Sequence, residues 1–321
     1  MVQPAPRATL PFGAVMAAGA ASQLSAPAGL GVLEVPLLAI TIGLAVAIAV
    51  SWVVSGRDRD DSLGGRFGEL TVPIGLAVVG GGLARLGGPV ALVSAAVAVA
   101  LAWATTALLA FSVLGGPRRS ATGLADVGGA WFLAPAVLAA DSLGTVALGV
   151  HRPGLEPVLG RAAVLASVAS GFAYLVVAAL VVMRIRAHHL EGVAAASWWI
   201  AAGCGGLCAA ALGRAAATPS TGGGAAGTLH LAALVCWCLG SVAAVPVLVG
   251  SARYLVGLRR LSGSQPWPPT FSTGVYALGT AEVGHIFALA PLVTLAGAAA
   301  VATLAFWGTT VLAFSPRLAR R

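Results

Sequence analysis

The chain has very little charge for its length. Only 9% of its 321 residues are Asp, Glu, Lys or Arg, whereas 59% are apolar. A water-soluble domain usually devotes roughly a quarter of its residues to these charged types, so the composition excludes a protein with a charged globular surface. Each membrane-spanning helix takes about 20 mainly apolar residues, which leaves enough for roughly nine to eleven spans. We therefore expect one all-helical transmembrane domain over residues 1–321.

Lysine is absent, and cysteines and aromatic residues are few. All 18 basic residues are arginines, and most of them fall between the predicted helices. Membrane topology explains the +8 net charge better than nucleic-acid binding does. The four cysteines lie in apolar stretches, which favours small packing residues over disulfides or metal ligands. The 43 glycines would let helix backbones approach closely in lipid.

Apolar runs separated by proline, glycine and charged residues predict ten helices. The predicted ranges are 12–28, 35–54, 70–86, 90–114, 127–143, 158–183, 193–216, 226–250, 271–287 and 289–314.

Arginines alternate between the two sides of these helices. A cluster follows each pair of predicted helices, and with Arg7 placed on the same side, 14 of the 18 arginines face one compartment. The other four are Arg85, Arg152, Arg161 and Arg214. The positive-inside rule then predicts a multi-pass protein of the cell (inner or plasma) membrane, with both termini in the cytoplasm. The repeating unit is a helical hairpin used five times.

The odd-numbered helices differ in composition from the even-numbered ones. Helix breakers interrupt the odd helices at Gly19, Pro73, Gly75, Pro135, Gly203 and Gly274. Breakers are tolerated in membrane helices where the freed backbone groups face protein or a water-filled cavity. The alternation predicts an inner ring of five kinked helices around a central pore and an outer ring of five straighter helices. The alternative is that glycine and proline are common in all membrane helices and alternate here by chance.

No group of residues suited to catalysis is evident, so we expect a protein that is not an enzyme and has no cofactor. His188, His189 and Glu191 are of metal-ligand types, but no cysteine or further histidine lies near them, and no metal site is expected. Asp141 falls near the end of a predicted helix, where contact with headgroups or water is the default expectation.

The polar but nearly uncharged interior favours the passage of small anions. Helix ends, hydroxyl groups and a positive vestibule can select anions without a fixed cation inside the pore. Arg85 and Arg214 end the third and seventh predicted helices on the same side, and we predict that they form an anion-attracting vestibule. The alternative for both is ordinary snorkelling at the membrane interface.

Five segments at the odd helices carry motifs in a consistent order. They are residues 12–19 (FGAVMAAG), 66–75 (RF followed by TVPIG), 131–135 (WFLAP), 198–200 (WWI) and 267–280 (WPPTFSTGVYALGT). These motifs resemble those of the tellurite-resistance/dicarboxylate transporter family, which includes malate permeases, sulfite exporters and plant slow anion channels. The last segment departs from the family pattern because Ser272 stands where proline is usual.

The resemblance implies ten helices in five hairpins around a central pore, and a homotrimer with one pore per subunit. It implies chloride, nitrate, sulfite, C4-dicarboxylate or tellurite as the transported anion. The phenylalanine that plugs the pore in that family corresponds to Phe271, with Thr270, Thr273 and Gly274 beside it as pore-lining or kink residues. The alternative for Phe271 is an ordinary packing residue.

The alternative function is a proton-coupled organic-anion exporter or a drug/metabolite exporter that works by alternating access. An exporter built from inverted halves should show similarity between its two halves, whereas this chain repeats on the scale of one hairpin.

Overall fold

The computed structural model describes residues 13–25, 31–55, 69–115, 128–152, 154–187, 195–255 and 267–318. Within these ranges the chain is helical and contains no strand, which confirms the predicted all-helical class. The described α-helices are α1 (Gly13–Ser25), α2 (Glu34–Ser55), α4 (Thr71–Leu86), α5 (Pro89–Gly115), α7 (Leu133–Val150), α8 (Glu156–Ala187), α9 (Ala195–Ala216), α10 (Gly223–Leu255), α11 (Trp267–Ile286) and α12 (Ala290–Leu318).

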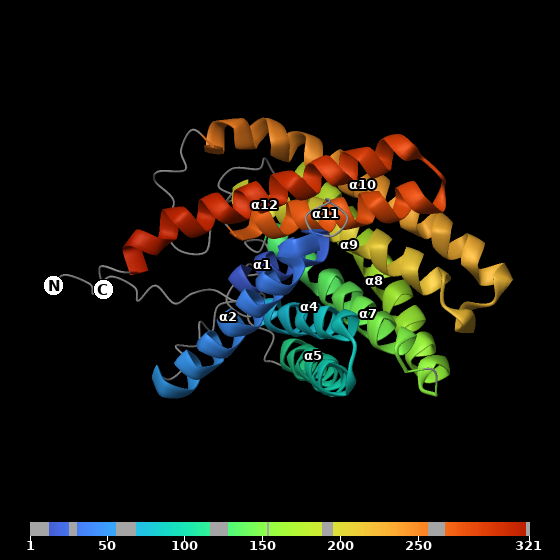
Figure 1. Ribbon diagram of the computed structural model, residues 1–321. Coiled ribbons are helices and arrows are strands. Elements are labelled where there is room, and N and C mark those ends of the chain that lie inside the picture. Colours follow the sequence, from blue (N-terminus) through green and yellow to red (C-terminus); the bar gives the residue numbers. More distant parts are fainter. Residues whose placement is uncertain are drawn as a thin grey trace.

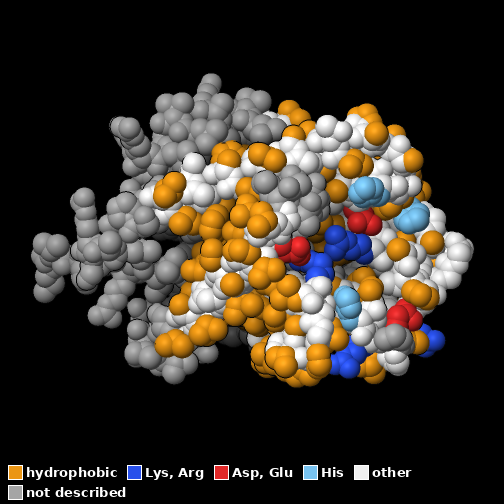
Figure 2. Space-filling view, viewed as in Figure 1, with side chains coloured by type: hydrophobic (Ala, Val, Ile, Leu, Met, Phe, Trp, Pro, Cys, Tyr) orange, Lys and Arg blue, Asp and Glu red, His pale blue; other side chains and the backbone are white. Residues whose placement is uncertain are grey.

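Several of these helices are long and apolar enough to cross a membrane. Seven described helices meet this condition, and α1 and α4 contribute shorter apolar segments. Large apolar side chains such as Phe111, Phe172 and Leu312 are 76%, 69% and 72% exposed, and hydrophobic side chains cover much of the surface in Figure 2. A surface of this kind suits lipid rather than water, so the chain has the character of a multi-pass membrane protein.

The helices pack in two sets of contacts. Helices that follow one another in the chain lie together: α1 with α2, α4 with α5, α7 with α8, α9 with α10, and α11 with α12 (Figure 1). In addition, α1 contacts α4, α4 contacts α7, α7 contacts α9, α9 contacts α11, and α11 contacts α1. The largest group of buried apolar residues draws heavily on these last five helices.

Glycines bring α9 and α11 unusually close. A Cβ atom added at Gly206 would lie 2.6 Å from the Cα atom of Tyr276, and one added at Gly203 would lie 2.6 Å from the Cα atom of Ser272. Backbone atoms at this distance leave no room for any side chain, which is the close approach that small residues permit in membrane helices.

The fifth predicted range is displaced from the observed helix. We expected residues 127–143, but α7 spans Leu133–Val150 and follows a short 3-10 turn, Gly128–Phe132. Pro135 therefore lies in the first turn of α7 rather than in its interior, as does Pro73 in α4. Proline suits the first turn because the N–H that it lacks has no partner there, so these prolines begin helices.

Most of the arginines that set the predicted topology lie outside the described residues. These are Arg7, Arg57, Arg59, Arg66, Arg118, Arg119, Arg259, Arg260, Arg320 and Arg321. His188, His189 and Glu191 also lie outside them. The orientation of the chain in the membrane stays a prediction.

Candidate functional site

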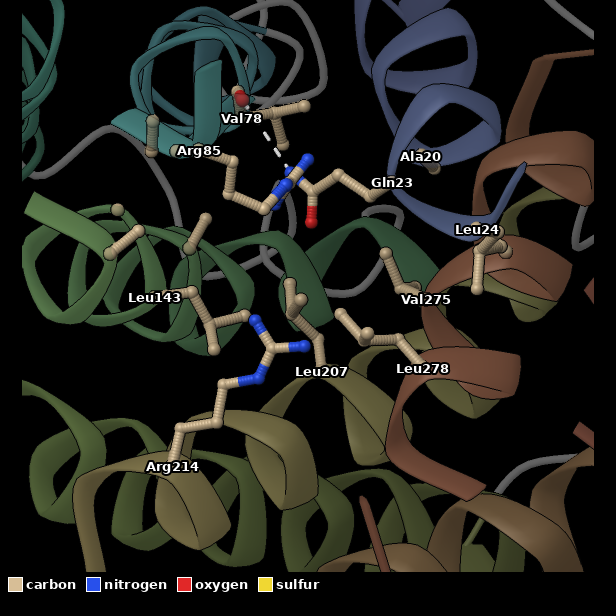
Figure 3. A pocket seen from close by; sticks show the side chains of 16 residues that line it. Ala20, Gln23, Leu24, Val78, Arg85, Leu143, Leu207, Arg214, Val275 and Leu278 are labelled. Atoms are coloured by element: carbon tan, nitrogen blue, oxygen red, sulfur yellow. Dashed lines mark hydrogen bonds between the residues drawn. The ribbon is translucent and has the colours of Figure 1, made fainter. Parts of the chain in front are cut away.

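One cavity is lined by residues of α1, α4, α7, α9 and α11 (Figure 3). Its volume is about 30 Å³, enough for about two water molecules. Its lining residues are Ala20, Gln23, Leu24, Ala77, Val78, Gly81, Arg85, Ala140, Leu143, Gly144, Ala147, Leu207, Arg214, Gly274, Val275 and Leu278. No acidic residue is among them, so its charged groups are all cationic.

The structure brings the two predicted vestibule arginines to this cavity. Arg85 and Arg214 both line it, from the last turns of α4 and α9. Figure 3 shows their side chains, with that of Gln23, extending into the same space. Arg85 and Arg214 are 129 positions apart in the sequence, further than any single hairpin spans, so the tertiary fold brings these two cations together.

Each arginine also has an acidic partner. The Nε atom of Arg85 lies 3.1 Å from Oε1 of Glu34, and the Nε atom of Arg214 lies 3.4 Å from Oε2 of Glu282. The C-terminal ends of helices carry partial negative charge, and several of the lining residues lie in last turns. The positive charges of the arginines thus offset the partial negative charges at the helix ends, and the glutamates in turn offset the charges of the arginines. The anion-attracting role of this pair stays a prediction.

Gln23 is a cavity residue that the sequence analysis did not single out. It is the only uncharged polar side chain among the lining residues, and its amide nitrogen lies 3.5 Å from the carbonyl oxygen of Val78. This contact is long for a hydrogen bond, so the amide N–H groups can also serve an occupant of the cavity. A glutamine within the apolar α1 was the available signal.

Phe271 lies one helical turn before the cavity. Gly274, Val275 and Leu278 of α11 line the cavity, and the spacing of three and four residues puts Phe271 on the same face of the helix. Its side chain is 4% exposed and belongs to the main group of buried apolar residues, together with Ile74 of α4. On this side of Gly274 the helices are therefore closed by apolar packing.

The remaining predicted residues are not among those that line the cavity. Gly19 packs against Val78, and Gly203 packs against Ser272. The hydroxyl of Thr273 donates to the carbonyl oxygen of Pro269 at 2.7 Å, within its own helix. Thr270 is buried, as are Pro73, Gly75 and Pro135. Of the predicted kink or pore residues, Gly274 alone reaches the cavity.

Asp141 is buried in the middle of α7, not near a helix end as predicted, because the observed helix begins and ends later in the chain. The hydroxyl of Thr106 in α5 lies 2.7 Å from Oδ2 of Asp141, and Oδ1 has no hydrogen-bond partner. Asp141 faces α5, whereas its neighbours Ala140 and Gly144 line the cavity. The acid thus lies behind the wall of the cavity.

A second, larger cavity adjoins Arg214. It has a volume of about 510 Å³ and is lined by residues of α7, α8, α9, α11 and the turn after α9, including Glu156, Arg214 and Glu282. Arg214 lines both cavities, so it lies between the narrow space and the wider one.

No protein-family model matches this chain, and no curated protein is significantly similar to it. The resemblance to the tellurite-resistance/dicarboxylate transporter family therefore rests on the five motifs and stays a prediction. In the part of the chain that the structure describes, no three His, Cys, Asp or Glu side chains are grouped as they would be to hold a metal ion.

Proposed function

We propose that this protein is a membrane channel or transporter for small anions, with its pathway between α1, α4, α7, α9 and α11. These five helices would form an inner ring, and α2, α5, α8, α10 and α12 would complete five hairpins around it. The contacts support this arrangement, because each inner helix touches the next and α11 returns to α1.

One observation carries the proposal: a cavity between these five helices whose polar side chains are two arginines and one glutamine, with no acid among the lining residues. Guanidinium groups are hydrogen-bond donors without an acceptor, and a glutamine amide can turn its N–H groups to a ligand. Such a lining stabilises an anion and repels a cation. The glutamates that pair with the arginines reduce the net positive charge beside the cavity, so that an anion is not bound too tightly to be released.

Phe271 would act as the gate of this pathway. An apolar ring across a narrow neck excludes water and so raises the barrier to an ion without any charge. The position of Phe271 supports this role. It lies on the same face of α11 as the cavity-lining residues, one helical turn away, where apolar packing closes the space between the helices.

The test is anion flux from liposomes with Phe271→Ala. We expect chloride and nitrate release to rise roughly tenfold or more, because lowering a barrier by about 1.4 kcal/mol already gives tenfold. Phe132→Ala is the matched control, since Phe132 is equally buried but packs against Tyr174 beside the start of α7. That variant should lose stability without gaining flux.

Two results would count against the proposal. If the wild-type protein and Phe271→Ala release anions no faster than empty liposomes, the transport function is wrong. If Phe271→Ala transports at the wild-type rate but unfolds at a lower temperature, Phe271 is a packing residue. The homotrimer, the cytoplasmic termini and the absence of a cofactor stay predictions, and native mass spectrometry from mild detergent tests the trimer.

A further inference from the structure

The buried acid behind the cavity is the strongest feature that the proposed function does not use. Asp141 has no solvent exposure, and among the described residues Thr106 supplies the only side-chain hydrogen bond to its carboxyl group. On the same face of α7, the hydroxyl of Thr145 accepts a hydrogen bond from Nε1 of Trp103 at 3.0 Å and donates to the carbonyl oxygen of Asp141 at 2.6 Å. This polar cluster lies between α5 and α7.

The hydrogen bonds around Asp141 fit a protonated acid. The hydroxyl of Thr106 has one hydrogen but two acceptors in reach, Oδ2 of Asp141 at 2.7 Å and the carbonyl oxygen of Ala102 at 2.9 Å. With a carboxylate, Thr106 must share its single hydrogen between the two acceptors, whereas a protonated Asp141 donates to Thr106 while Thr106 donates to Ala102, which gives each contact its own hydrogen. Oδ1 is then the carbonyl oxygen of a neutral acid, which can lack a partner at far smaller cost than a carboxylate oxygen can.

Among the residues that the structure describes, no charged group balances Asp141. Its own helix has no other ionisable residue before its end, and α5 and the turn Gly128–Phe132 have none at all. On the other helices that contact α7, the ionisable residues with described side chains are Arg85 of α4; Glu156, Arg161 and Tyr174 of α8; and Cys204, Cys208 and Arg214 of α9. None of these pairs with Asp141. Arg85 pairs with Glu34 and Arg214 pairs with Glu282 instead.

We propose that Asp141 is a proton-binding site whose occupancy is linked to that of an anion in the cavity, so that the two ions bind together. This inference rests on the proposed function. The lining residues Ala140 and Gly144 flank Asp141 in α7, so the acid and an anion in the cavity are separated by about the width of a helix, roughly 10 Å. At that distance and an effective dielectric constant near 20, a carboxylate weakens anion binding by roughly tenfold or more.

The linkage follows from charge balance. The carboxylate of Asp141 takes up one proton and becomes a neutral acid, and this removes the negative charge that opposes the anion. The anion in turn stabilises the proton on Asp141 by the same factor, since linkage is reciprocal. When the anion leaves, the proton is released to water and the carboxylate forms again. The pair that binds is electrically neutral.

The experiment follows the carboxylic C=O stretch of Asp141 by infrared spectroscopy on the full-length protein in detergent. The band is titrated with pH in nitrate and, at equal ionic strength, in isethionate, a larger anion. We expect the midpoint to lie about one pH unit higher in nitrate, which corresponds to the tenfold linkage. Asp141→Asn should lack the band, whereas Ser142→Ala should keep it, because Ser142 faces α8 through Ser167 and the carbonyl oxygen of Ala163.

Liposome flux gives the second measurement. Nitrate flux should fall roughly tenfold as pH rises through the midpoint in the wild type and in Ser142→Ala. Asp141→Asn, which has the shape and neutrality of the protonated acid, should keep the acid-side rate at every pH. An unshifted midpoint, or an Asp141→Asn profile identical to the wild type, overturns the linkage. A shifted midpoint without any flux would leave the proton site standing and refute transport, whereas flux without a shift would do the reverse.

Discussion

The helices that line the cavity and the helices outside them differ in a way that reverses the rule for water-soluble proteins. Among the seven membrane-length helices, α9 is the least hydrophobic and the most buried, with 94% of its span inside the protein. The most hydrophobic, α2 and α8, have only 22% and 33% buried. Lipid is as apolar as leucine, so burial is no longer driven by hydrophobicity and close packing takes over. The interior is accordingly rich in Ala, Gly, Ser and Cys.

The largest expected effect comes from adding one methyl group where α9 meets α11. Gly206→Ala should destabilise the protein by about 3 kcal/mol, because the new Cβ atom would meet backbone atoms of Tyr276 and Val275, which cannot rotate away. Thermal unfolding in detergent measures the loss. Gly297→Ala in α12 is the matched control, since no atom lies within 4 Å of its added Cβ. Equal stability losses in the two variants would erase the difference between the inner and outer helices.

A smaller effect is expected where an outer helix is attached by a hydrogen bond. Trp103→Phe should cost about 1 kcal/mol, because it removes the bond from Trp103 of α5 to Thr145 of α7. Trp307 of α12 has a buried Nε1 without a hydrogen-bond partner, so Trp307→Phe should be neutral or slightly stabilising. Denaturant titration of the two variants separates these outcomes. A larger loss for Trp307→Phe would show that ring packing, not the hydrogen bond, holds these helices.

The smallest expected change in stability is at the mouth of the cavity. Arg85→Gln should alter the free energy of unfolding by less than about 1 kcal/mol, as is usual for partly exposed ion pairs. Anion flux should nevertheless fall, because the cavity loses one of its two cations. Arg161→Gln is the control, since Arg161 is exposed on α8 and does not line the cavity. Unchanged flux in Arg85→Gln would make this arginine an interfacial anchor only.

Much of the helix content could be predicted from the sequence. Nine of the ten predicted ranges begin within about one helical turn of the observed start, because long apolar runs separated by breakers leave few choices. The prediction of the fifth range was wrong because a proline such as Pro135 can either break a helix or lie in its first turn. Because the prediction treated Pro135 as a break, it placed Asp141 near the end of a helix, whereas Asp141 lies in the middle of α7.

The site was predictable only in part. Arg85 and Arg214 could be assigned to one side from the alternation of arginines, and the structure brings both to one cavity. The contact between Asp141 and Thr106 depends on the rotation of α7 against α5, and helix rotation cannot be read from composition. Gln23 was missed for the same reason.

The backbone contact between α9 and α11 has a mechanical consequence for any opening of the pathway. Gly206 and Gly203 rest on backbone atoms of α11, so these two helices can neither approach further nor roll easily over one another. Between α1 and α4, by contrast, Gly19 rests on the side chain of Val78, which can change rotamer. The contact between α9 and α11 is therefore rigid, whereas the contact between α1 and α4 can adjust. If the cavity widened, α9 and α11 would therefore move together, and the displacement would be concentrated at the contact between α1 and α4.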